Sequence, residues 1–247
     1  MLWRKLFLRW AVLESEKERA EKILLELEKA LGGEIDPEEF LAYKVFLETH
    51  DLFKTLVATI ITQNTSENNS FRAWRRLTSR VRVEPEAIAS LELDELAELI
   101  RPAGLQYQKA RAIKKLAELI IREFGGDASR ILELPLEEAR RKLTSIPGIG
   151  WKTVDVVLSM YGKPTIGVDT HISRVAMRLG FTNTRSYERV RGKLMELYDP
   201  RTYHRVHLLY ILLGRRYCRA RNPKCNMCPV REYCKYYRDR IENPGKR

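Results

Sequence analysis

Apolar residues recur at the three-to-four-residue spacing of an α-helix along most of the chain. Residues 14–31 show this spacing and predict an amphipathic helix, whereas residues 51–62 contain a run that is apolar nearly all round, as in a buried helix. The other predicted helices span residues 37–50, 67–79, 93–100, 107–124, 136–144, 151–161, 171–179, 186–197, 203–214 and 229–241. The alternation typical of strands is missing, so the sequence predicts an all-α fold.

The composition is strongly basic and rich in charge. Charged residues make up 32% of the 247 residues, above the usual quarter, and the formal net charge is +12. Abundant Glu, Lys and Arg are typical of a thermophile surface, but thermophily alone would not leave so much positive charge uncompensated. The excess predicts a polyanionic partner, for which nucleic acid is the usual candidate.

Membrane insertion and secretion are not expected. No stretch is long and apolar enough to span a bilayer. The apolar residues 2–12 are interrupted by Arg4, Lys5 and Arg9, unlike the core of a secretory signal. The sequence therefore predicts a cytoplasmic, nucleoid-associated protein of prokaryotic type.

A glycine-containing turn joins two predicted helices within residues 136–161. Its sequence, Ile-Pro-Gly-Ile-Gly at residues 146–150, places Gly148 and Gly150 on either side of Ile149. Such a turn lets the backbone come close to another molecule. The helix that follows presents unpaired N–H groups and a positive dipole end, which bind anions. In a basic protein the expected anion is a DNA phosphate.

Lys152 and Asp169 are the candidate reactive residues. Lys152 lies in the first turn after the glycines, where a lysine usually contacts a phosphate. Alternatively its neutral amine is a nucleophile that forms a Schiff base. Asp169 fits the N-cap of the next helix, and a capping carboxylate can also face an active site. His171 is expected to be a polar residue of that helix's first turn rather than a catalytic group.

The cysteines of the chain form one cluster near the C-terminus. The four are spaced Cys218-x6-Cys225-x2-Cys228-x5-Cys234, which indicates metal or iron–sulfur ligation rather than a disulfide framework. Composition alone favours a tetrahedral zinc site slightly, although zinc motifs prefer two Cys-x2-Cys pairs. A cubane iron–sulfur cluster takes the same four ligands.

The segment between the first two cysteines is basic. Arg219, Arg221 and Lys224 fall within it, and the flanking ligands would fix both of its ends. We interpret it as a loop that contacts DNA phosphates; the alternative is a merely solvated loop.

A weaker repeat precedes the glycine turn. Residues 100–105, Ile-Arg-Pro-Ala-Gly-Leu, followed by Lys109, resemble residues 146–150 followed by Lys152. Two ordinary glycine-containing helix turns would look the same.

Together these motifs resemble one known family. Ile-Pro-Gly-Ile-Gly-Trp-Lys-Thr at 146–153, Val-Asp-Thr-His at 168–171 and the cysteine spacing are similar to those of the endonuclease III family of helix–hairpin–helix DNA glycosylases. The resemblance covers roughly residues 40–236. The cysteine spacing is that of the family, so the resemblance implies a [4Fe–4S] cluster in place of zinc.

The resemblance also implies a domain organisation. Two helical domains would flank a DNA-binding groove. Residues 41–164 would form the domain with the hairpin, and residues 1–40 would join residues 165–247 in the cluster domain with the iron–sulfur loop at 218–234. The family likeness implies a monomer that binds double-stranded DNA containing damaged or mispaired bases.

Four residues acquire roles from the resemblance. Lys152 would be the attacking amine and Asp169 its carboxylate partner. Gln63 would fill the gap left by an extruded nucleotide, and Leu105 would be a wedge in the base stack. The simpler alternatives are that Gln63 neighbours a helix C-cap and that Leu105 belongs to the core.

The expected activity is a DNA glycosylase that also nicks the strand. Oxidised pyrimidines are the default substrate of the family. The sequence departs from the familiar bacterial pattern at residues 62–70, at Trp151 and at Asp155, so thymine or uracil opposite guanine and oxidised purines stay open. Two alternatives are a monofunctional mismatch glycosylase, in which Lys152 only contacts a phosphate, and a DNA-binding module without catalysis.

Overall fold

The computed structural model describes residues 2–242, with side chains described from residue 15 to residue 240. Within that range the regular structure is helical and contains no strand, which confirms the all-α prediction. The chain divides into two compact units, one made of Met1–Ile35 with Pro164–Arg247 and the other of Asp36–Lys163. Among the described residues no helix combines the length and the apolar character needed to cross a membrane.

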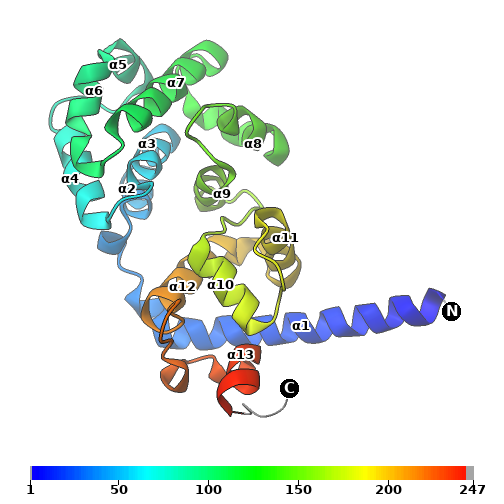
Figure 1. The fold of residues 1–247 in the computed structure, drawn as a ribbon. Helices are drawn as coiled ribbons and strands as arrows, with labels where there is room; N and C mark the ends of the chain where they lie inside the picture. The colour runs from blue at the N-terminus through cyan, green and yellow to red at the C-terminus, as the bar shows by residue number, and fades with distance from the viewer. Residues whose placement is uncertain (1, 243–247) are drawn as a thin grey trace. The chain divides into compact units, whose positions relative to one another are not determined.

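The unit Asp36–Lys163 is built around one buried helix (Figure 1). Its elements are η2 Pro37–Glu39, α2 Leu41–Thr49, α3 Leu52–Thr62, α4 Glu67–Thr78, α5 Pro85–Ser90, α6 Leu93–Leu99, η3 Arg101–Ala103, α7 Gln106–Phe124, η4 Ala128–Glu133, α8 Leu136–Thr144 and α9 Trp151–Met160. Helix α3 contacts α2, α4, α7 and α9, and nearly all its side chains are buried, as its apolar run predicts. Asp51 caps its N-terminus by accepting a hydrogen bond from the Lys54 amide at 2.9 Å.

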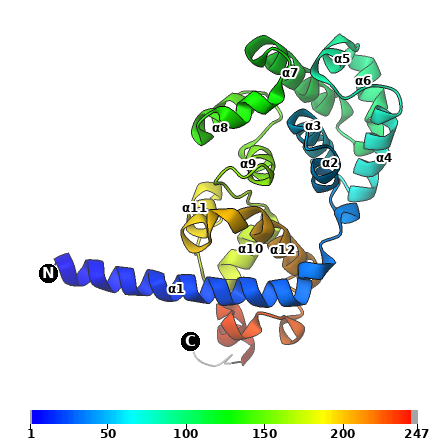
Figure 2. The ribbon, with the colours of Figure 1, turned by 180° about the vertical axis from the view of Figure 1, so that it is seen from behind.

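The other unit places a long N-terminal helix against C-terminal helices. Its elements are α1 Leu2–Leu31, η1 Gly32–Glu34, α10 Thr170–Leu179, α11 Tyr187–Leu197, η5 Pro200–Thr202, α12 Tyr203–Arg216, η6 Cys225–Met227, η7 Arg231–Tyr233, α13 Lys235–Tyr237 and the π-helical turn η8 Arg238–Glu242. Helix α1 packs on α11 and α12 through fully buried residues such as Ile23 and Leu27. Figures 1 and 2 show α1 continuing, toward its N-terminus, well past these partners.

Four helix predictions from the sequence are wrong. The first helix, predicted over residues 14–31, begins at Leu2. The helix predicted over 229–241 is a series of short turns, because the backbone must bend to bring Cys228 and Cys234 to one cavity. Pro37 opens a 3₁₀ turn and not α2, since non-helical backbone at Phe40 separates the two. Helix α5 was not predicted, because six residues are too few to display a helical period.

Candidate active site and cluster loop

The hairpin turn between α8 and α9 needs glycine at one position and leaves space at another. Gly148 has φ +95°, and a Cβ added there would lie 3.2 Å from Cβ of Ala112 on α7. Ile149 is 3% exposed and anchors the turn in the core. A Cβ on Gly150 would meet nothing within 4 Å, so the fold itself does not demand glycine there. Gly150 thus leaves its backbone accessible to another molecule.

Helix α9 begins at this open turn with Trp151 and Lys152, both exposed. No side chain caps its N-terminus, so the first-turn N–H groups and the positive end of the helix dipole remain available. This is the anion-binding geometry that the sequence predicted.

A buried ion pair joins the two helices of the hairpin. Arg140 on α8 donates from Nε and Nη2 to the two carboxylate oxygens of Asp155 on α9, at 2.8 and 3.0 Å. The two residues are 3% and 0% exposed. The Arg140 guanidinium also lies 4.7 Å from the ring centroid of Trp151 and bonds to Glu137. The unusual Asp155 is therefore the partner of Arg140, a relation that spacing alone does not reveal.

Gln63 lies directly beside the hairpin. It is the C-cap residue of α3, and its Nε2 donates to the Gly148 carbonyl at 3.2 Å and to Oγ1 of Thr153 at 2.9 Å. The simpler alternative, a residue at a helix C-cap, describes its backbone but not these side-chain contacts. The structure thus brings Gln63 together with the glycine turn.

Leu105 is not a core residue. Its side chain is 52% exposed, and its backbone has φ +49°, in the left-handed region that leucine rarely adopts. An exposed leucine held in such a conformation needs surrounding structure to maintain it. This geometry contradicts the core alternative for Leu105.

Asp169 caps α10, as the sequence predicted. Its Oδ1 accepts a hydrogen bond from the Ile172 amide at 2.7 Å. Nearby, burial lowers the pKa of His171, outweighing the raising effect of Asp169. Arg174 Nη2 lies 3.0 Å from Nδ1 of His171 and Nε donates to the Cys218 carbonyl at 2.8 Å. His171 is therefore a half-buried residue of the first turn of α10 with Arg174 beside its ring.

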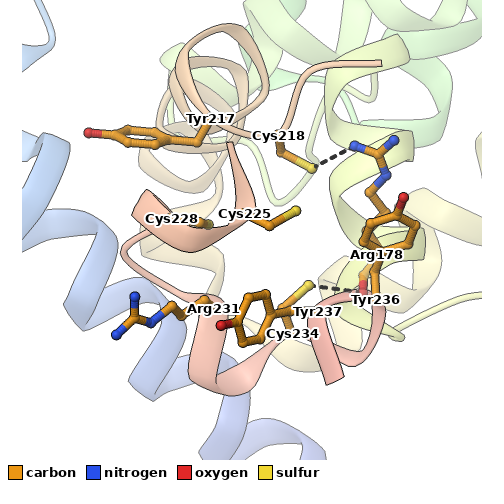
Figure 3. A pocket seen from close by; sticks show the side chains of 9 residues that line it. All are labelled: Arg178, Tyr217, Cys218, Cys225, Cys228, Arg231, Cys234, Tyr236 and Tyr237. Atoms are coloured by element: carbon orange, nitrogen blue, oxygen red, sulfur yellow. Dashed lines mark hydrogen bonds between the residues drawn. The ribbon is translucent and has the colours of Figure 1, made fainter. Parts of the chain in front are cut away.

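The four cysteines line one cavity. Figure 3 shows Cys218, Cys225 and Cys234 turned toward a common space, with Arg178 of α10 and Tyr236 beside it. All four cysteines are free thiols, not disulfides. Arg178 donates from Nη1 to the Cys218 sulfur at 3.4 Å, and its guanidinium lies over the Tyr236 ring.

This donor set fits an iron–sulfur cluster. Burial raises the pKa of the Cys228 thiol to about 12 and raises those of Cys225 and Cys234. Thiols in such an environment become thiolates when a metal centre coordinates them, because the metal supplies the missing positive charge. Within the described chain no group of three or more Cys, His, Asp or Glu side chains is arranged to hold a single metal ion. Four cysteine thiols around one cavity are the ligand set that a [4Fe–4S] cluster takes.

The basic loop is exposed, and α10 holds its backbone. Arg219, Arg221 and Lys224 are all exposed, as the phosphate-contact interpretation requires. Arg178 donates to the carbonyls of Arg219 and Ala220 at 2.7 and 3.2 Å. The side chain that borders the cysteine cavity therefore also shapes the basic loop.

Sequence reasoning missed several residues that organise these sites. Arg140, Arg174 and Arg178 carry no motif signal, because each acts through a partner distant in the chain. Lys109 was visible only through the weak repeat, yet it is 2% exposed and donates to two backbone carbonyls.

Comparisons with known proteins place this chain in a class. Residues 57–200 match the sequence model of the HhH-GPD superfamily base excision DNA repair proteins. Residues 218–234, which hold the cysteines, match that of the iron-sulfur binding domain of endonuclease III. The chain is thus a helix–hairpin–helix base excision repair protein with an iron–sulfur domain, and the prediction of a [4Fe–4S] cofactor is confirmed.

Individual relatives narrow this class to a family. Endonuclease III of Sulfolobus acidocaldarius is 35% identical over 85% of this chain and 93% of its own length. That of Thermotoga maritima is 31% identical over 77% and 85%. A structure described as a non-covalent endonuclease III–DNA complex is 30% identical, with a TM-score of 0.73 over 92% of this chain and 98% of that one. The chain belongs to the endonuclease III family of DNA glycosylases with AP lyase activity, as its motifs predicted.

Proposed function

We propose that Lys152 is the nucleophile of this base excision repair enzyme and Asp169 its essential carboxylate. The substrate is double-stranded DNA with a damaged or mispaired base, an oxidised pyrimidine by default, and the protein acts as a monomer. The observation that carries the proposal is the setting of Lys152. It is an exposed residue at the uncapped N-terminus of α9, two positions after Gly150, which has open space around it.

The reaction begins with extrusion of the target nucleotide, because its sugar cannot be attacked inside the stack. Unstacking costs a few kcal/mol, least at damaged or mispaired bases. Leu105 offsets part of this by entering the stack, and Gln63 by occupying the vacated position. The exposure of Leu105 and the place of Gln63 beside the glycine turn support these roles.

The neutral amine of Lys152 then attacks C1′ of the deoxyribose. A bond forms between Nζ and C1′, the bond from C1′ to the base breaks, and the base leaves with the electron pair and takes up a proton. Asp169 stabilises the positive charge that develops on the sugar and assists the proton transfers. Its cap to α10 fixes this carboxylate in place.

Strand nicking follows from the Schiff base. The nitrogen then loses one proton, the bond from C1′ to the ring oxygen O4′ breaks, and O4′ takes up a proton. The protonated imine that forms between Nζ and C1′ is the Schiff base, and it acidifies the hydrogens on C2′. Loss of one C2′ proton and cleavage of the bond from C3′ to oxygen release the 3′ phosphate. Water then hydrolyses the Schiff base and frees Lys152.

The loop of residues 218–234 contributes to DNA binding. The four cysteines would hold the [4Fe–4S] cluster, which cross-links residues 218–234 when bound. Arg219, Arg221 and Lys224 contact DNA phosphates, an interpretation that their exposure supports.

Borohydride trapping tests the proposal. Reaction with a panel of duplexes, each with one lesion or mismatch, in the presence of borohydride should yield a covalent protein–DNA adduct. Lys152→Ala should abolish the adduct, while Lys142→Ala, which removes another lysine of the same hairpin, should not. An adduct that survives Lys152→Ala would remove the Schiff-base role, and base release without nicking before alkali treatment would instead identify a monofunctional mismatch glycosylase.

The substitution Asp169→Asn tests the proposed role of the Asp169 carboxylate. Asparagine caps helices as well as aspartate does, so Asp169→Asn should leave stability within a few tenths of a kcal/mol. Base removal should fall about 100-fold to 1,000-fold, the usual cost of one electrostatic contact to a transition state. Asp51→Asn, the equivalent cap of α3, is the matched control. If Asp169→Asn retained full activity, Asp169 would be only a cap.

A further inference from the structure

Lys109 is a buried lysine that no catalytic step uses. It lies in the first turn of α7 and is 2% exposed. Its Nζ donates to the Ile61 carbonyl at 2.9 Å and to the Ala103 carbonyl at 2.8 Å. Burial also lowers the pKa of Lys109 to about 8. Burying an ammonium is unfavourable, so its retention in a core requires specific partners.

Both partners lie next to residues assigned to the base stack. Ile61 is two residues before Gln63, in the last turn of α3, where carbonyls lack intrahelical partners. Ala103 is two residues before Leu105, at the end of η3. One ammonium therefore joins two backbone segments that are far apart in sequence and that end in Gln63 and Leu105.

A second contact of Lys109 reaches the wedge itself. Its backbone amide donates to the Leu105 carbonyl at 3.0 Å, closing the first turn of α7. Leu105 is held at φ +49°, a conformation that persists only where the surroundings over-determine it. Lys109 thus holds this turn from its main chain and from its side chain.

The contacts of these segments extend to the α8–α9 hairpin. Gln63 donates to the Gly148 carbonyl, and Gly148 packs against Ala112, three residues after Lys109 on α7. A displacement of the α3 terminus relative to the Leu105 turn would therefore also disturb the contact of Gln63 with the glycine turn.

We propose that Lys109 is a positioning residue that locks the Gln63 and Leu105 segments together, so that both side chains enter the DNA stack as one rigid unit. This inference rests on the proposed function, because it assumes that nucleotide extrusion precedes attack by Lys152. Removing Lys109 slows extrusion and leaves the attack itself intact.

The central experiment is a double-mutant cycle. Lys109→Met keeps most of the side-chain length and removes the donors, while Lys115→Met removes an exposed lysine from the same helix. Single-turnover base removal, and the fluorescence change of 2-aminopurine next to the lesion, should slow about tenfold to 100-fold in Lys109→Met only, the range that misplaced groups produce. If Lys109 acts through the wedge, the loss should shrink in the Leu105→Ala background. Unchanged extrusion, or fully additive losses, would overturn the proposal.

Two further arms separate this proposal from its premise and from misfolding. A single-stranded abasic oligonucleotide needs no wedge, so Lys109→Met should give the borohydride adduct on it as the parent enzyme does, whereas Lys152→Ala should give none. Loss of this adduct in folded Lys109→Met would overturn the positioning role, and its absence in the parent enzyme would overturn the proposed function. Should Lys109→Met fail to fold, Lys109→Gln keeps two donors on a shorter stem, and the same double-mutant cycle decides.

Discussion

The α8–α9 hairpin and the loop of residues 218–234 are stabilised by different interactions. The turn at 146–150 rests on a large apolar core within Asp36–Lys163, with Ile149 buried and the Arg140–Asp155 pair joining its two helices. In residues 218–234 only Val230 is buried, and the secondary structure consists of two short 3₁₀ turns. Apolar burial therefore explains the first region and cannot explain the second.

This difference predicts which of the two regions needs the iron–sulfur cluster in order to be ordered. A loop that buries one apolar side chain cannot offset the conformational entropy lost on ordering seventeen residues. The four cysteines surround one cavity, and Arg174 and Arg178 donate hydrogen bonds to the loop backbone. These interactions order the loop only when a bound cluster cross-links the cysteines. The α8–α9 hairpin should be ordered without the cluster, and the loop of residues 218–234 should not.

The largest expected effect follows from breaking that cross-link. A bound iron–sulfur cluster should make the purified protein brown. Cys228→Ser should remove this colour and the hydrogen-exchange protection of residues 218–234, because metal binding and loop folding are one process. Amides of Asp36–Lys163 should exchange at their original rates. Met227→Ser, which alters a 70% exposed neighbour, is the control. A colourless, zinc-containing parent protein, or a loop still protected in Cys228→Ser, would contradict this dependence.

The next largest effect is the loss of stability when the Arg140–Asp155 ion pair of the hairpin is broken. Arg140→Ala leaves Asp155 buried without its bidentate partner, a change that typically destabilises a protein by about 3–5 kcal/mol. Glu137→Ala removes a mostly exposed partner of the same arginine and should change stability by less than about 0.5 kcal/mol. Urea unfolding of both variants measures the difference, and equal losses would show that the buried pair does not brace the hairpin.

An apolar replacement sharpens this result. Arg140→Met combined with Asp155→Leu removes both charges, so it should recover much of the stability that Arg140→Ala loses. The cluster colour should persist in all these variants, since the loop depends on its cysteines and not on this pair. Loss of the cluster colour in Arg140→Ala would show that the hairpin and the loop of residues 218–234 are not independently stabilised.

The sequence predicted the helices better than the contacts between them. Periodicity located most helices of the chain, and short motifs located Lys152, Asp169 and the cysteines, because each signal is local. Arg140 with Asp155, and Lys109 with Ile61, are pairs of residues 15 and 48 positions apart. No local pattern encodes such pairs. The short turns after Cys228 were predicted as one helix because their order depends on the cavity and not on propensity.

The smallest expected effect measures whether the loop acts as one surface on DNA. Arg221→Ala and Lys224→Ala should each flatten the dependence of log K on log salt by about 0.9, the value for one lost phosphate contact, and should weaken binding equally for all sequences. Lys29→Ala, on an exposed stretch of α1, should leave the slope unchanged. If cluster binding orders the loop, Cys228→Ser should lose the contributions of Arg219, Arg221 and Lys224 together, although it removes no positive charge. If the salt dependence of log K in Cys228→Ser equalled that of the parent protein, the loop would bind DNA without being ordered. Its phosphate contacts would then not depend on the cluster.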